Sequence, residues 1–152
     1  MRIASLPTLF SSLNFYHQVT GAISAKMQIV FSKTLSKTDV DVRLSFPMKV
    51  LKDFKFPEGK DKLEFEVTDH STGKSWIFGL SRRNSARHPH PKPVLSSGWL
   101  AFVHAKGLKR NDRVILFIEK DKANKTRFKI RAQRKTPPSF KLFGEEIKYV
   151  EL

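Results

Sequence analysis

The chain has 152 residues, of which 39% are hydrophobic, which suffices for one domain with a buried core and some length for tails. Its formal net charge of +15 predicts polyanionic partners, and nucleic acid is the commonest of these. The absence of cysteine excludes disulfides, thiol catalysis and the usual structural zinc sites, and the longest apolar run, residues 114–118, is too short to span a membrane.

The first 25 residues are predicted to be an N-terminal extension of the domain. They are rich in serine, and the first acidic residue of the chain is Asp39. A transit peptide has this composition too. Because Pro7 and Gly21 interrupt any amphipathic helix, we favour a disordered extension over residues 1–25.

Residues 26–133 are predicted to form one mostly β domain. Apolar and polar residues alternate with a period of two, which indicates strands that pack one face on a core. In the hairpin that surrounds Gly73, this glycine is expected to supply the positive φ of the turn. The clearest predicted strands are 27–32, 44–46, 63–68, 76–80, 113–118 and 127–132. In the first of them, Met27, Ile29 and Phe31 alternate with Gln28, Val30 and Ser32, so the first three are expected on the core side.

Two short helices are predicted between these strands. Residues 47–54 begin with proline, which is favoured in the first turn of a helix. The second helix starts near Trp99, with Ser96 or Ser97 as its N-cap and Gly107 at its end. About seven short strands and two helices predict a small open barrel.

Two long polar segments, residues 32–41 and 81–93, are the candidate functional elements, and we call them the first and second arm. Arginine and lysine neutralise phosphates or contact guanine, and asparagine pairs with adenine. The hydroxyl groups of serine and threonine can bind a phosphate or a base. The alternative is that both segments are solvated loops. The clustering of Arg-Arg-Asn-Ser at 82–85, between two strands of so basic a chain, favours contact with DNA. The first arm carries Lys33, Thr34, Ser36 and Lys37, and the second carries Arg82, Arg83, Asn84, Ser85, Arg87 and Lys92.

The spacing of Ser36 and Asp39 is typical of a capping box, which would shape the first arm around one helical turn. Elsewhere, the cations of residues 127–131 are expected on one face of a strand, either near phosphate or on a solvated exterior.

The sequence contains no pattern that predicts catalysis or a cofactor. Glu64 and Glu66 fill the polar face of a strand, whereas a nuclease needs carboxylates that converge on a metal. His88 and His90 are separated by proline and have no cysteine beside them, so a metal site is not expected there. We therefore predict a protein that is not an enzyme and has no cofactor.

Several motifs in order along the chain resemble the plant B3 DNA-binding domain. They are Lys-Thr-Leu-Ser-Lys-Thr-Asp-Val at 33–40, the proline-led helix at 47–51, Trp-Ile-Phe at 76–78 and Leu-Ser-Ser-Gly-Trp-Leu-Ala-Phe-Val at 95–103. The resemblance covers about residues 26–133. The chain departs from the family at Asn111, which replaces a turn glycine and tolerates the same conformation. It departs again in the second arm, which lacks the Tyr-Trp-Asn-Ser of some subgroups.

The resemblance implies an open seven-stranded β-barrel (a pseudobarrel) with two short helices. It also implies a nuclear transcription factor whose two arms grip the major groove of double-stranded DNA. The aromatic residues Trp76, Phe78, Trp99 and Phe102 map to the core. Carried over by position, the DNA-binding residues are Lys33, Thr34, Ser36, Lys37, Arg82, Arg83, Asn84, Ser85 and Lys92, with Arg87 and Ser97 in addition.

The remaining residues, 134–152, are predicted to be a C-terminal tail. Lys141, Leu142, Phe143 and Gly144 resemble the start of an Arg/Lys-Leu-Phe-Gly-Val repression motif, which implies a transcriptional corepressor as a partner. The alternative is a terminal strand.

An RNA-binding accessory protein is the other functional class that the charge permits. Readers of RNA often display stacking aromatics on a sheet, whereas the aromatics here alternate into the core.

Overall fold

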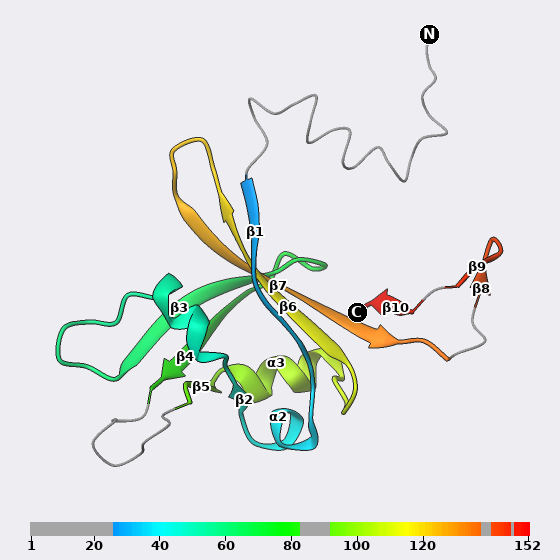
Figure 1. Ribbon diagram of the computed structural model, residues 1–152, viewed down its shortest axis with the longest axis horizontal. Helices are drawn as coiled ribbons and strands as arrows, with labels where there is room; N and C mark the ends of the chain where they lie inside the picture. Colours follow the sequence, from blue (N-terminus) through cyan, green and yellow to red (C-terminus); the bar gives the residue numbers. More distant parts are fainter. Residues whose placement is uncertain (1–25, 83–91, 138–140, 147) are drawn as a thin grey trace, which may run out of the picture.

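The computed structural model describes residues 26–82, 92–137, 141–146 and 148–152 (Figure 1). The predicted N-terminal extension, residues 1–25, lies outside this part of the chain. Among the helices that are described, none has the length and apolar character needed to cross a membrane.

The domain is built around one strongly curled β-sheet (Figure 1). Its strands follow the order β1-β6-β7-β3-β4-β5-β2, and only the β3–β7 pair is parallel. This arrangement confirms the predicted open seven-stranded pseudobarrel. The strands of this path are β1 (Lys26–Thr34), β2 (Leu44–Ser45), β3 (Lys62–Asp69), β4 (Ser75–Ser81), β5 (Val94–Ser97), β6 (Arg113–Lys120) and β7 (Thr126–Lys135).

The inward face of β1 differs from the prediction. Met27 and Ile29, expected on the core side, are 48% and 65% exposed. The pairing of β1 with β6 shifts register between Ile29 and Phe31, which is a β-bulge. Because a bulge adds one residue to a strand, it reverses the alternation, and Val30 now packs against the core beside the buried Phe31.

Three short helical segments accompany the sheet in the described part of the chain. The predicted helix at 47–54 is a 3-10 helix, η2 (Met48–Asp53), and the helical turn expected at Ser36–Asp39 is the start of α2 (Lys37–Asp41). The third, α3 (Trp99–Lys106), ends at Gly107 as predicted. Its predicted serine N-cap is wrong: Gly98 caps it with a left-handed φ of 76°, because Ser96 and Ser97 still belong to β5.

The core lies between the curled sheet and α3. The predicted core residues Phe78, Trp99 and Phe102 are completely buried and contact one another edge-on or tilted. Trp76 is half-buried against Phe102. Positive φ values at Gly73 and Asn111 confirm the turns expected at both positions.

The predicted tail contributes a strand to the same sheet. The final strand, β10 (Tyr149–Glu151), pairs antiparallel with the end of β7. Before it, β8 (Lys141–Leu142) and β9 (Glu145–Glu146) form a separate two-stranded hairpin. The Phe143 ring at the turn of that hairpin is 91% exposed. The end of the chain is therefore tied to the domain by backbone pairing.

Candidate nucleic-acid interface

The first arm is a capped turn rather than an irregular loop. Ser36 precedes α2 in extended conformation, and its hydroxyl accepts a hydrogen bond from the backbone N–H of Asp39 at 3.2 Å. In return, the Asp39 carboxylate accepts the Ser36 backbone N–H at 2.8 Å. These two bonds confirm the predicted capping box and give the arm a defined shape.

Lys33 fastens this turn to the neighbouring strand. Its Nζ donates to Asp39 Oδ1 at 2.7 Å, to the Ser45 carbonyl at 3.2 Å and to Ser45 Oγ at 2.5 Å. The Asp39 side chain is only 2% exposed, and the Trp99 indole N–H donates to the Asp39 carbonyl at 2.6 Å. Asp39 thus joins β1, α2, β2 and α3 at one point.

Asp39 and Asp69 are buried carboxylates whose pKa departs clearly from its ordinary value. Burial raises each pKa, but the hydrogen bonds from Lys33 and Ser36 to Asp39, and from Lys106 and Ser71 to Asp69, outweigh it. The net pKa of each carboxyl is therefore lower than the ordinary value of an aspartate. Both carboxylates stay charged at neutral pH.

These lowered values predict acid-sensitive stability. A carboxyl with a depressed folded pKa stabilises the fold above its unfolded pKa, and this contribution is lost as pH falls through the folded value. We expect the free energy of unfolding, measured in urea, to change little through these groups from neutral pH to about pH 5 and to fall below about pH 4. The variant Asp39→Asn should show a shallower acid decline than the unmodified chain, and equal slopes would contradict the prediction.

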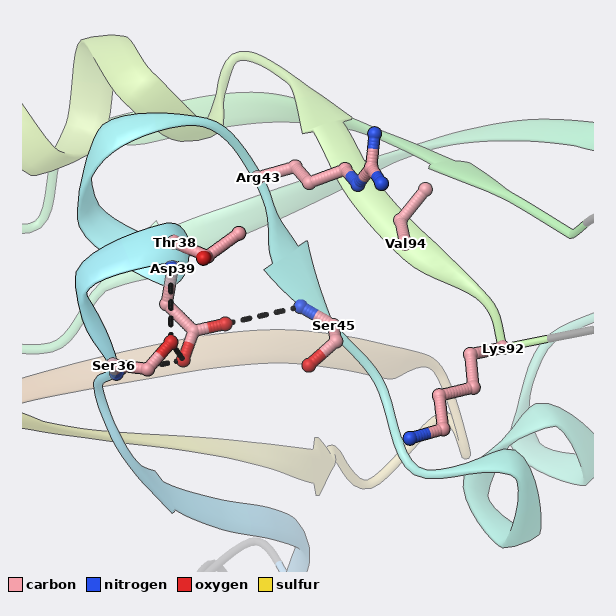
Figure 2. Close-up of a pocket in the computed structure, with 7 residues that line it drawn as sticks. All are labelled: Ser36, Thr38, Asp39, Arg43, Ser45, Lys92 and Val94. Carbon is pink, nitrogen blue, oxygen red and sulfur yellow. Dashed lines mark hydrogen bonds between the residues drawn. The ribbon is translucent and has the colours of Figure 1, made fainter.

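A hollow of about 290 Å³ lies beside this turn (Figure 2). Arg43, which follows α2, and Lys92, which precedes β5, lie at different ends of it, with Asp39 between Ser36 and Ser45. Among the described residues, the side chains of Arg43 and Lys92 have no ion-pair or hydrogen-bond partner. The hollow therefore presents two uncompensated cations next to hydroxyl groups. Its lining residues are Ser36, Thr38, Asp39, Arg43, Ser45, Lys92 and Val94.

The other predicted residues of the first arm are on the surface. Thr34, Ser36 and Lys37 are exposed. Lys37 pairs with Asp41 four residues along α2, but its side chain is 80% exposed. Exposed pairs of this kind contribute little stability, so Lys37 is free to exchange Asp41 for a phosphate.

The structure describes the two ends of the second arm. Arg82 pairs with Asp61 at 3.2 Å, and its guanidinium lies 4.5 Å from the centre of the Phe56 ring. Lys92 lines the hollow described above, whereas Ser97 lies in a different hollow with Lys60 and Lys62. Arg83, Asn84, Ser85 and Arg87 lie outside the described residues.

The sequence patterns do not indicate Arg43, because the first arm is predicted to end at residue 41. Its position next to a two-residue strand does not indicate a binding role in the sequence. The pairing of β2 with β5 is what brings Arg43 to the same hollow as Lys92. The strand cations left open in the sequence have partners: Arg127 with Asp121, Lys129 with Glu119 and Arg131 with Glu151.

In the part of the chain that the structure describes, no group of acidic or histidine side chains is arranged to hold a metal ion. Glu64 and Glu66 are exposed on the outer face of β3, as expected for the polar half of a strand. His88 and His90, where no metal site is expected, lie outside the described residues.

The described chain is thus a small open β-pseudobarrel with Lys37, Arg43 and Lys92 available on and beside α2. The family model of the B3 DNA binding domain matches residues 31–134, and the chain belongs to this family. A comparison with curated proteins finds no significant match.

Solved structures share the fold. The Arabidopsis FUS3–DNA complex is 21% identical with a TM-score of 0.59, and the match covers 72% of this chain and 100% of that one. The Arabidopsis transcription factor LEC2–DNA complex is 21% identical with a TM-score of 0.52, covering 68% and 93%. The B3 domain of the UbaLAI restriction endonuclease with cognate DNA is 13% identical with a TM-score of 0.52, covering 83% and 79%.

Proposed function

We propose that this protein is a transcription factor that binds double-stranded DNA in a sequence-specific way through its two arms. The observation that carries the proposal is the B3 family match, since residues 31–134 include the whole of both arms. Two similar structures, FUS3 and LEC2, are complexes with DNA, and LEC2 is described as a transcription factor. The net charge of +15 supports a polyanionic partner.

The geometry around the first arm supports this proposal. Lys37, Arg43 and Lys92 come from three different segments, and each is available to a phosphate oxygen. Base readout is assigned to the second arm, with Arg83 for guanine and Asn84 for adenine. The remaining proposed contacts are Thr34, Ser36, Arg82, Ser85, Arg87 and Ser97.

The finer parts of the proposal follow from the family. A transcription factor acts in the nucleus. The chain is proposed to bind DNA without cleaving it, although a B3 domain also occurs in the UbaLAI restriction endonuclease. Residues 141–144 are proposed to recruit a corepressor, and the exposed Phe143 ring is consistent with such a contact.

Selection from a randomised duplex library, with the full chain at near-physiological salt, tests the proposal. Enrichment of one short motif would establish specific recognition. Retention of duplexes without an enriched motif would refute specificity and favour a general nucleic-acid-binding protein. Competition by single-stranded RNA, in the same buffer, would separate that alternative from non-specific binding to DNA.

The two cations of the hollow are expected to contribute through phosphate contacts. The slope of log K against log salt is negative, and each phosphate neutralised by a protein cation increases its magnitude by about 0.9. The double variant Arg43→Ala/Lys92→Ala should therefore lower the magnitude of that slope by about 2 and weaken binding to all duplexes alike. Fluorescence anisotropy over a series of salt concentrations measures it.

Lys122→Ala is the matched control, because Lys122 is exposed in the turn between β6 and β7, at the other end of the molecule from α2 (Figure 1). It removes the same type of charge without touching the arms. If the slope of the control fell as much per charge as that of the double variant, the assignment of the hollow to DNA would be wrong.

A further inference from the structure

The ammonium group of Lys33 has no hydrogen left for a DNA phosphate. An ammonium has three donor hydrogens. All three have acceptors within the protein: Asp39 Oδ1 at 2.7 Å, the Ser45 carbonyl at 3.2 Å and Ser45 Oγ at 2.5 Å. The Lys33 side chain is 25% exposed, compared with 80% for Lys37 on the same arm. A phosphate could reach Lys33 only after one of these bonds had been broken.

The partner of Lys33 is an acid at the place where an anion would bind. Asp39 lines the hollow together with Arg43 and Lys92, and its lowered pKa keeps it charged at neutral pH. An uncompensated carboxylate there would repel a phosphate group. The Lys33 ammonium cancels this charge, so that Arg43 and Lys92 determine the sign of the hollow.

The same pair also determines the shape of the arm. The Asp39 carboxylate accepts the N–H groups of Ser36 and Ser45 at 2.8 and 3.3 Å, which places the start of α2 against β2. Lys33 holds that carboxylate from β1. Without the ammonium, the carboxylate would be buried without its counter-charge and would shift or take up a proton.

We propose that Lys33 is a positioning residue of the DNA-binding arm, which acts through Asp39 by neutralising and fixing its carboxylate, and does not contact DNA. This inference rests on the proposed function, because it concerns how the arm binds duplex DNA. It reassigns a residue that the family resemblance places among the DNA contacts. Lys37, Arg43 and Lys92 remain as the phosphate contacts around it.

The test compares three variants of the full chain with the unmodified protein: Lys33→Met, Lys37→Ala and the double variant Lys33→Met/Asp39→Asn. A residue that contacts phosphate contributes to the salt slope, whereas a positioning residue does not. We expect Lys33→Met to weaken duplex binding by about tenfold or more and to leave the salt slope unchanged. Lys37→Ala should lower the magnitude of the slope by about 1. The double variant should recover most of the affinity, because the asparagine side chain is uncharged and its amide oxygen can still accept the Ser36 N–H.

A second readout follows the Asp39 carboxyl by NMR in the absence of DNA. Since the hydrogen bond from Lys33 lowers the pKa of Asp39, this pKa should rise in Lys33→Met and stay low in Lys37→Ala. A salt slope reduced by about 1 in Lys33→Met, with no recovery in the double variant, would assign Lys33 to a phosphate contact and overturn the proposal.

Failure of the proposed function is distinguishable from failure of this inference. If the unmodified chain bound no duplex DNA, the proposed function would fail and the DNA role of Lys33 would fail with it. An unchanged Asp39 pKa in Lys33→Met, in a chain that does bind DNA, would refute the pairing alone.

Discussion

Replacing Gly98 with alanine is expected to remove a large fraction of the stability of the domain. Gly98 has a φ of +76°, and a Cβ on it would lie 2.1 Å from the Ile77 carbonyl oxygen and 3.2 Å from the Phe78 ring. The left-handed conformation costs alanine on the order of 1–2 kcal/mol. The overlap with backbone adds about 1–3 kcal/mol. A domain with about 5–15 kcal/mol of total stability would lose a large fraction of it.

Gly107→Ala is the matched control for this variant. Gly107 also has a left-handed φ, +62°, but a Cβ there meets no atom within 4 Å. It should therefore lose only the conformational part, about 1–2 kcal/mol. Urea unfolding of both variants, followed by circular dichroism, gives the difference. Equal losses would mean that the close approach of Gly98 to β4 contributes nothing.

Gly98 also illustrates how far local sequence patterns predict the fold. The apolar spacing of Trp99, Phe102 and Val103 predicts a helix, and α3 forms there. The same local reasoning selects a serine as its cap, since serine is a preferred N-cap residue. What decides against it is the pairing of Ser97 with Gly79 on a neighbouring strand, which no local pattern reveals.

The bulge in β1 is a failure of the same kind. Strict alternation predicts that Met27 and Ile29 face the core, and the register shift before Phe31 turns them outward. A bulge depends on the partner strand, here β6, which is more than eighty residues away in the sequence. Alternation therefore locates strands but does not establish which face is buried along their whole length.

The candidate site was predictable where its chemistry is local. The capping box of Ser36 and Asp39 is a short-range pattern, and the structure has both of its bonds. The place of Arg43 and the hydrogen bonds of Lys33 depend on how β2 pairs and on where Ser45 lies, which are long-range features. Residue type alone therefore predicts that Lys33 contacts DNA. The charge of a side chain shows that it can bind phosphate, and only its neighbours show whether it is free to do so.

The second large effect is expected at a buried ion pair outside the arms. Lys106, at the end of α3, contacts Asp69, at the end of β3, with a Nζ–Oδ2 distance of 2.6 Å. The two side chains are 8% and 3% exposed. Lys106 Nζ also donates to Ser71 Oγ at 2.6 Å and to the Leu152 carbonyl at 3.0 Å, so this pair joins β3, α3 and the residue after β10.

Asp69→Ala should lower the free energy of unfolding by about 3–5 kcal/mol, because it leaves a buried ammonium without its counter-charge. Lys37→Ala, which breaks an exposed pair, should lower it by less than about 1 kcal/mol. The double variant Asp69→Asn/Lys106→Met removes both charges and should regain much of the loss, since the penalty comes from the unpaired charge. Urea unfolding at neutral pH measures all three. If the loss in Asp69→Ala were as small as that in Lys37→Ala, the pair would not hold β3, α3 and the end of the chain together.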